Sequence, residues 1–206
     1  MPSYTLEYFD GCALGEVSRQ LFVLAEKPYT DKRISFAEWP THKTKTPFGK
    51  MPVLFIDGKE LPQSFAIARY LAREFGYAGN TAFEQAWVDA LGDQFKDYWD
   101  AFHAFFVIIG NIYPGDKEKV QTESGEPARD AFFPLIEKQL SKSTSGFLVG
   151  STVTWIDLVI ADHAHFLTEV LPGFLDKYPK VLEHIKKIHA IPQIKKWVES
   201  RPARKF

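Results

Sequence analysis

The sequence predicts a small α/β domain followed by an all-helical domain. Strand-like runs occur only within the first 62 residues, a cluster of glycines lies within residues 76–80, and helical spacing of apolar residues dominates after it. We therefore expect one domain over residues 1–78 and a second over residues 81–206.

Composition supports a globular protein and excludes several classes. The chain has 206 residues, 45% of them hydrophobic, and a net charge of −1, without the basic excess of a nucleic-acid binder. The single cysteine, Cys12, cannot form an internal disulfide, which favours a reducing, cytoplasmic location. We expect no signal peptide and no membrane span, because no apolar run is long enough.

The first domain should run β-α-β, then a β-hairpin, then α. Alternation of apolar and polar residues marks the strands, and Asp57-Gly58 is a strong hairpin turn. Pro62 lacks an amide donor, so its strand should lie at a sheet edge. The expected strands are residues 4–9, 31–36, 53–56 and 59–62, and the expected helices are residues 15–26 and 65–75, the latter capped by Ser64.

The rest of the chain should be helical. Thr154 and Asp157 have the spacing of a capping box, and Val153 and Leu158 that of a hydrophobic staple, so we expect this segment to serve folding. The expected helices cover residues 81–109, 128–140, 155–170, 180–189 and 193–200.

Two features of the first domain are candidates for anion binding. Tyr8 ends the first strand just before a glycine-containing turn, where ligands of α/β sheets gather, but a core aromatic with its hydroxyl in solvent is the commoner case. Gln63 and Ser64 precede a helix whose free N–H groups suit a carboxylate, or they form an ordinary cap.

Two further segments could hold a peptide ligand. If the Met51–Pro52 bond is cis, the Met51 backbone could pair with an extended peptide; otherwise Pro52 is an ordinary strand-entry proline. Trp39 and Lys43 could reach one carboxylate together, or belong to a solvated turn.

Other reactive residues are less well placed. Cys12 precedes a helix, but no second cysteine or histidine lies near it, so it is more simply a bystander than a nucleophile. His163 and His165 do not share a helix face, and Lys96 lies between Asp93 and Asp97. We expect no metal site.

In this order and spacing, these motifs resemble a cytosolic glutathione transferase over the whole chain. The resemblance is greatest to the sigma class and, within it, to the nematode-type (nu) enzymes. The matching stretches are residues 4–9, 15–16 with Arg19, 39–40, 47–53, 63–71, 153–157 and 197–202.

The resemblance implies a thioredoxin-like N-terminal domain, an all-helical C-terminal domain and a homodimer. It implies glutathione as co-substrate and no cofactor. Tyr8 would be the catalytic residue, with its hydroxyl bonded to the glutathione sulfur, and Asp97 would reach the γ-glutamyl amine from the partner subunit. The remaining residues implied to bind glutathione are Trp39, Lys43, Gly49, Lys50, Met51, Pro52, Gln63 and Ser64.

The resemblance also implies a pocket for hydrophobic electrophiles. Cys12 and Leu14 stand where sigma-class sequences often carry arginine, which removes positive charge near the thiolate. Lys96 stands where related prostaglandin D synthases carry an acidic residue for a divalent ion, which disfavours that isomerase activity. The implied pocket walls are Phe9, Cys12, Leu14, Trp99, Phe102, Phe106, His163 and Phe206.

Several functions remain open at this stage. The protein could conjugate glutathione to electrophiles, with reduction of hydroperoxides as a second reaction, or it could carry haem and other apolar ligands with little catalysis. A thiol transferase acting through Cys12 is a third hypothesis. Phe48 fits either a dimer-interface side chain or an ordinary loop aromatic.

Overall fold

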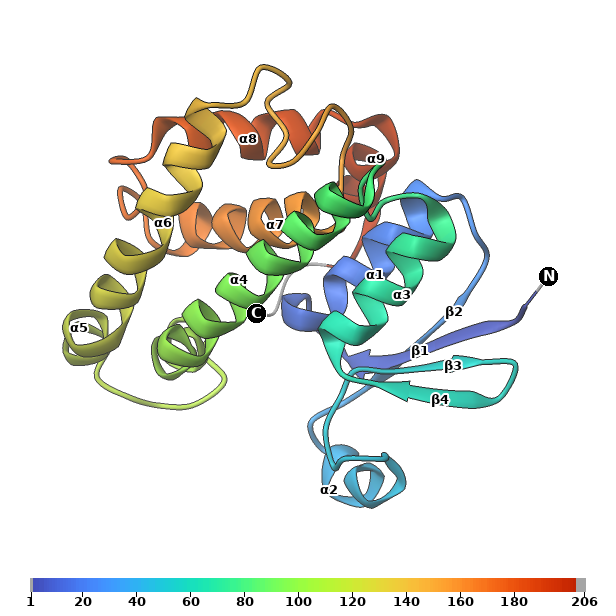
Figure 1. The fold of residues 1–206 in the computed structure, drawn as a ribbon. Helices are drawn as coiled ribbons and strands as arrows, with labels where there is room; N and C mark the ends of the chain where they lie inside the picture. The colour runs from blue at the N-terminus through green and yellow to red at the C-terminus, as the bar shows by residue number, and fades with distance from the viewer. Residues whose placement is uncertain (1, 203–206) are drawn as a thin grey trace. The chain divides into compact units, whose positions relative to one another are not determined.

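A computed structural model describes residues 2–202 of the chain. The described residues form two compact units, one of residues 2–78 and 191–202, the other of residues 79–190. Figure 1 shows the elements of both units. None of the described helices is long and apolar enough to cross a membrane.

The first unit is built on a four-stranded mixed sheet with the strand order β2-β1-β3-β4. Strand β1 runs parallel to β2 and antiparallel to β3, which pairs with β4 in a hairpin. The predicted edge position of Pro62 is confirmed, because β4 is the last strand of the sheet. The strands are β1 (Tyr4–Phe9), β2 (Thr30–Ile34), β3 (Val53–Ile56) and β4 (Lys59–Pro62).

Helices α1 (Ala13–Leu24) and α3 (Ser64–Phe75) pack together on one face of this sheet (Figure 1). Side chains alternate along a strand, so Tyr4, Leu6 and Tyr8 face these helices, and the Tyr4 ring meets Phe22 of α1 at 5.2 Å. Thr5 and Glu7 therefore face the opposite side. This thioredoxin-like arrangement is the predicted fold.

Three local predictions in this unit are wrong. Strand β2 covers Thr30–Ile34 instead of residues 31–36. Helix α1 begins at Ala13 instead of residue 15 and ends at Leu24 instead of residue 26. Ser64 is the first helical residue of α3 instead of its cap: the cap is Gln63, whose backbone has φ = 78° and ψ = 115°. A serine near a helix start predicts a cap from composition, but Gln63 turns the chain so that Ser64 already has a helical conformation.

A short helix occurs where the sequence suggested either a binding site or a solvated turn. Helix α2 covers Trp39–His42, and a 3₁₀ turn follows at Lys43–Lys45. Pro40 lies in the first turn of α2, where its missing N–H costs nothing.

The second unit is helical, as predicted, with a core rich in aromatic rings. Helix α4 (Ala82–Ile109) carries Phe95 and Tyr98, whose rings contact Phe132 of α6. The same helix carries Gly92, which lies against the fully buried Trp155 of α7. A short α5 and a π-helical turn were not predicted. The remaining elements are α5 (Lys117–Val120), the π turn η2 (Gln121–Gly125), α6 (Glu126–Ser141), α7 (Trp155–Val170) and α8 (Pro179–His189).

The predicted capping box at the start of α7 is confirmed. The fully buried Asp157 carboxylate accepts hydrogen bonds from the backbone N–H of Thr154 at 2.8 Å and of Leu148 at 2.8 Å. It also bonds Nε2 of His184, at 2.8 Å. One side chain therefore joins a loop and two helices.

The last helix, α9 (Pro192–Ser200), belongs to the first unit and packs on α1. The buried Glu16 carboxylate accepts from Nε1 of Trp197 at 2.6 Å and from Arg201 at 2.5 Å. The predicted division of the chain into a functional domain over residues 1–78 and another over residues 81–206 stays a prediction.

Candidate active site

The strand register brings several of the predicted site segments to one end of the sheet. Val53 of β3 lies opposite Glu7 on one side and Pro62 on the other. Tyr8, Pro52 and Gln63 each follow or precede one of these paired residues by one position, so all three come to the same end of the sheet. The ends of β1 and β4 and the start of β3 therefore meet here.

The segment after β2 emerges at the same end, because β2 runs parallel to β1 and Phe9 pairs with Ile34. Figure 1 shows α2 beyond the end toward which the β1 and β4 arrows point. The Phe9 ring contacts the Trp39 ring with centroids 5.3 Å apart. The segments around Tyr8, Trp39, Pro52 and Ser64 thus come from separate parts of the sequence and converge.

Tyr8 lies at the centre of this end and is 6% exposed. Its hydroxyl faces the backbone N–H groups of Leu14 and Gly15, in the first turn of α1. Burial raises the pKa of Tyr8 to about 12, although the Arg19 guanidinium and the Leu14 amide act to lower it. The phenol is therefore a hydrogen-bond donor at neutral pH.

Two helix N-termini reach this end of the sheet. Helix α1 follows the end of β1 and α3 follows the end of β4, and the side chains of Cys12 and Gln63, at the two cap positions, make no capping hydrogen bond. First-turn N–H groups and the helix dipole give each end a partial positive charge. This end suits a ligand that carries negative groups.

Lys43 and Gly49 lie together beyond α2. A Cβ added at Gly49 would lie 3.6 Å from Cε of Lys43, and Gly49 has φ = 61°, which a larger residue rarely adopts. The hydroxyl of Thr46 donates to the Lys43 carbonyl oxygen at 2.8 Å and fixes this turn. The Met51–Pro52 peptide bond that follows is cis, as the resemblance implies.

Arg19 is a residue whose role the sequence did not show. It is 0% exposed and donates to the carbonyl oxygens of Phe9 at 3.1 Å and Gly11 at 2.5 Å, and to the Asp31 carboxylate at 3.0 Å. It therefore holds the turn between Tyr8 and α1. The available signal was an arginine three residues after Glu16 in a helix with several apolar residues.

Comparison with known families agrees with this geometry. The model of the "Glutathione S-transferase, N-terminal domain" matches residues 4–73, and that of the "Glutathione S-transferase, C-terminal domain" matches residues 99–201. The chain belongs to the glutathione S-transferase family. It is therefore an enzyme of the transferase class.

Similar members of the family come from nematodes. "Glutathione S-transferase 1" of Ascaris suum is 45% identical over 98% of both chains. A Caenorhabditis elegans glutathione S-transferase structure has a TM-score of 0.94 and 46% identity over 100% of both chains. The structure of a Nu-class glutathione S-transferase from Haemonchus contortus has a TM-score of 0.89 and 45% identity over 100% of both chains.

The predicted walls of the electrophile pocket lie in both units. In the first, Phe9 and Leu14 are half-buried, while Cys12 is buried beside Tyr8. In the second, Trp99, Phe102, Phe106 and His163 belong to the aromatic core.

Phe102 has no exposed surface, and Nε2 of His163 hydrogen-bonds the Tyr98 hydroxyl at 2.7 Å. Phe206 lies outside the described residues. A shared pocket therefore stays a prediction.

The remaining predicted residues are more exposed. Asp97 is exposed on α4, beside the Lys96–Asp100 ion pair of 2.7 Å. Lys50 and Phe48 are exposed in the loop before the cis bond. Within residues 2–202, no three His, Cys, Asp or Glu side chains are grouped so as to hold a metal ion.

Proposed function

We propose that this transferase conjugates glutathione to hydrophobic electrophiles, with the Tyr8 hydroxyl donating a hydrogen bond to the glutathione thiolate. The observation that carries the proposal is the place of Tyr8: a buried phenol that keeps its proton, at the amide-lined N-terminus of α1. A sulfur anion bound there would meet one hydroxyl and the positive end of a helix.

The expected stabilisation is large enough to matter. A free thiol with a pKa near 8.5 is only a few per cent ionised at neutral pH. A hydrogen bond to a charged acceptor contributes roughly 1.5–3 kcal/mol, and one pKa unit corresponds to about 1.36 kcal/mol. Tyr8 could therefore lower the thiol pKa by about one to two units. The thiolate then attacks carbon, the C–S bond forms, and the leaving group departs as an anion.

The other segments at this end would bind the rest of the tripeptide. We propose that Trp39 and Lys43 bind the glycyl carboxylate, and that the backbone of Lys50 and Met51 pairs with the cysteinyl part. Gln63 and Ser64 would bind the γ-glutamyl carboxylate at the N-terminus of α3. Their convergence on one end of the sheet supports this assignment.

We further propose that the protein is of the nematode (nu) type and acts in the cytoplasm as a homodimer, in which Asp97 of one subunit reaches the γ-glutamyl amine in the other. The 45% identity to the Nu-class enzyme of Haemonchus contortus supports the nu assignment. The same thiolate could reduce a hydroperoxide, with two glutathione molecules giving the disulfide, an alcohol and water.

The test is steady-state conjugation of glutathione to chlorodinitrobenzene by the wild type and Tyr8→Phe. We expect kcat/KM to fall by about ten- to a hundredfold, since a bond of roughly 1.5–3 kcal/mol is lost. Tyr77→Phe is the matched control, because it removes one hydroxyl that donates to the Leu24 carbonyl oxygen at the other end of α1.

Unchanged activity in Tyr8→Phe would refute the proposed role of Tyr8. A negligible wild-type rate would instead favour a carrier of haem or other apolar ligands. Titration with haem, followed by its Soret band, would then test that function.

A further inference from the structure

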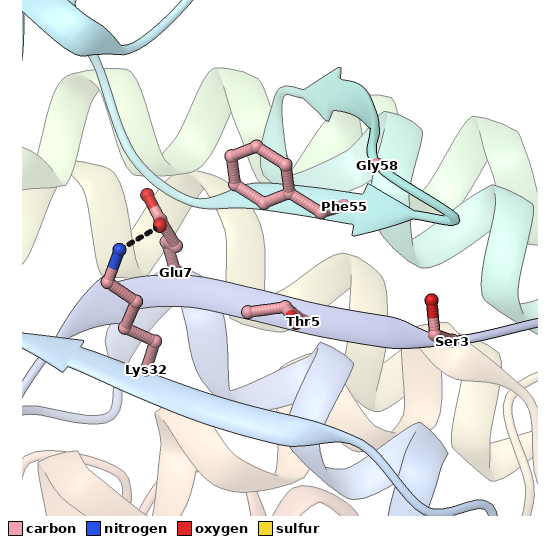
Figure 2. Close-up of a pocket in the computed structure, with 6 residues that line it drawn as sticks. All are labelled: Ser3, Thr5, Glu7, Lys32, Phe55 and Gly58. Carbon is pink, nitrogen blue, oxygen red and sulfur yellow. Dashed lines mark hydrogen bonds and ion pairs between the residues drawn. The ribbon is translucent and has the colours of Figure 1, made fainter.

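A carboxylate without a place in the proposed chemistry lies one residue before Tyr8. Glu7 points from β1 to the sheet face opposite α1 and α3, and Figure 2 shows it in a shallow groove there with Lys32 and Thr5. Glu7 is only 7% exposed. Removing a carboxylate from water is costly unless it is paired, so its partners decide its role.

Glu7 has two partners of different origin. Its Oε1 accepts from Nζ of Lys32 at 2.5 Å, and Lys32 is its register neighbour on β2, so this ion pair stays within the sheet (Figure 2). Its Oε2 bonds Nε2 of His42 at 2.8 Å. His42 is the last residue of α2, so this second bond joins the sheet to α2.

The bond between Glu7 and His42 matters because of where His42 lies in the chain. Trp39 begins α2 three residues earlier, and Lys43 follows His42 directly and begins the 3₁₀ turn. The contact between the Phe9 and Trp39 rings secures the first residue of α2 by apolar packing. The bond from Glu7 secures its last residue by a directional, charge-assisted contact.

We propose that Glu7 is a positioning residue for the subsite that binds the glycyl carboxylate of glutathione. Through His42 it holds α2 against β1, and so holds the Trp39 indole and the Lys43 ammonium at the spacing that one carboxylate requires. Glu7 itself does not touch glutathione. This inference rests on the proposed assignment of Trp39 and Lys43.

The test compares glutathione with γ-glutamylcysteine, which lacks the glycyl residue. In Glu7→Leu we expect KM for glutathione to rise about five- to tenfold, as for a lost hydrogen bond, with kcat within about twofold of wild type. KM for γ-glutamylcysteine should not change. A merely structural defect would weaken both thiols alike, and that result would overturn the inference.

Three further variants sharpen the result. Glu7→Gln should largely restore wild-type KM, because its amide oxygen can still accept from His42. Lys32→Met should have no effect on either thiol, since it removes only the pair within the sheet. His42→Leu should reproduce Glu7→Leu from the α2 side, which keeps the inference testable if Glu7→Leu folds poorly.

Lys43→Ala separates this inference from the function on which it rests. If Lys43→Ala weakens glutathione but not γ-glutamylcysteine, the subsite is established, and Glu7→Leu alone then decides the role of Glu7. If Lys43→Ala weakens neither thiol, or weakens both equally, the proposed subsite is wrong and the inference fails with it.

Discussion

The Tyr8 ring lies directly against the backbone of Gly15 in the first turn of α1. A Cβ atom added at Gly15 would lie 2.9 Å from Cε1 of Tyr8, and closer still to Cδ1 and Cγ. Real Cβ contacts are not that short, so any side chain at position 15 must displace the ring or the helix. The missing side chain is what lets the Tyr8 hydroxyl approach the amides of that turn.

Gly15→Ala should therefore reduce activity more than stability alone explains. Overpacking of this kind costs about 1–3 kcal/mol, and a displaced hydroxyl loses its bond to the thiolate. We expect kcat/KM to fall at least tenfold, measured by conjugation of chlorodinitrobenzene. Gly58→Ala is the control: it has open space but φ = 80°, so it should cost stability at the opposite end of the sheet and leave activity intact.

The raised pKa of Tyr8 predicts how stability changes at alkaline pH. Burial raises the pKa from 10.0 to about 12 in the folded state, so the folded protein holds this proton more tightly than the unfolded chain does. The stabilisation is complete below pH 10 and is lost as the pH rises toward 12. Between pH 9 and 11 the loss attributable to Tyr8 is on the order of 1 kcal/mol.

Urea unfolding of the wild type and Tyr8→Phe at both pH values measures this contribution. The wild type should lose more free energy of unfolding over this interval than the variant, by that amount. An equal loss in both proteins would show that Tyr8 titrates normally in the folded state.

Asp157 should matter for stability and not for catalysis. It accepts from the Thr154 and Leu148 amides and bonds His184, all out of contact with water. In Asp157→Asn the amide nitrogen must face some of these donors, so we expect a loss of about 2–4 kcal/mol in the free energy of unfolding. Asp176→Asn, on the surface of the same unit, should cost little.

The activity of Asp157→Asn and Asp176→Asn should also be measured, under conditions in which both variants are fully folded. Asp157→Asn should keep the wild-type kcat there. A selective loss of kcat in fully folded protein would contradict a purely structural role.

The sequence predicted most of the fold because its signals were local. The alternation in β1, the Asp57-Gly58 turn and the long apolar periodicity of α4 each specify one element. Helix α2 has four residues, too few to show a period, and the π turn η2 depends on contacts with α4. Such elements are set by tertiary packing and leave little trace in sequence.

The residues of the candidate site also differ in whether the sequence could identify them. Tyr8 could be singled out because a strand end before a glycine turn is a recognisable context. The backbone conformation of Gln63, the burial of Arg19 and the bond between Glu7 and His42 could not, because each depends on a partner distant in sequence or on one dihedral angle. Residues that touch the ligand are easier to predict than those that hold them.

Arg19 provides the last prediction, since it holds the turn that joins Tyr8 to α1. Its planar fork reaches two carbonyl oxygens and Asp31 at once, which one lysine ammonium cannot do. Arg19→Lys should therefore leave a buried acceptor unpaired and let the turn shift. We expect a loss of about 2–4 kcal/mol in stability, and a fall in kcat/KM of at least tenfold because Tyr8 moves with the turn.

Arg33→Lys is the matched control for this prediction. Arg33 shares the Asp31 carboxylate, at 2.9 Å, but is half-buried and also bonds Asp10 near the surface at 3.0 Å. Its replacement should cost less than about 1 kcal/mol and leave kcat/KM unchanged. If both variants lose activity alike, the guanidinium contacts with Asp31 that they share are what matters, and the bonds of Arg19 to the turn are not. If only Arg19→Lys loses activity, the fixed position of the turn is required for Tyr8 to act.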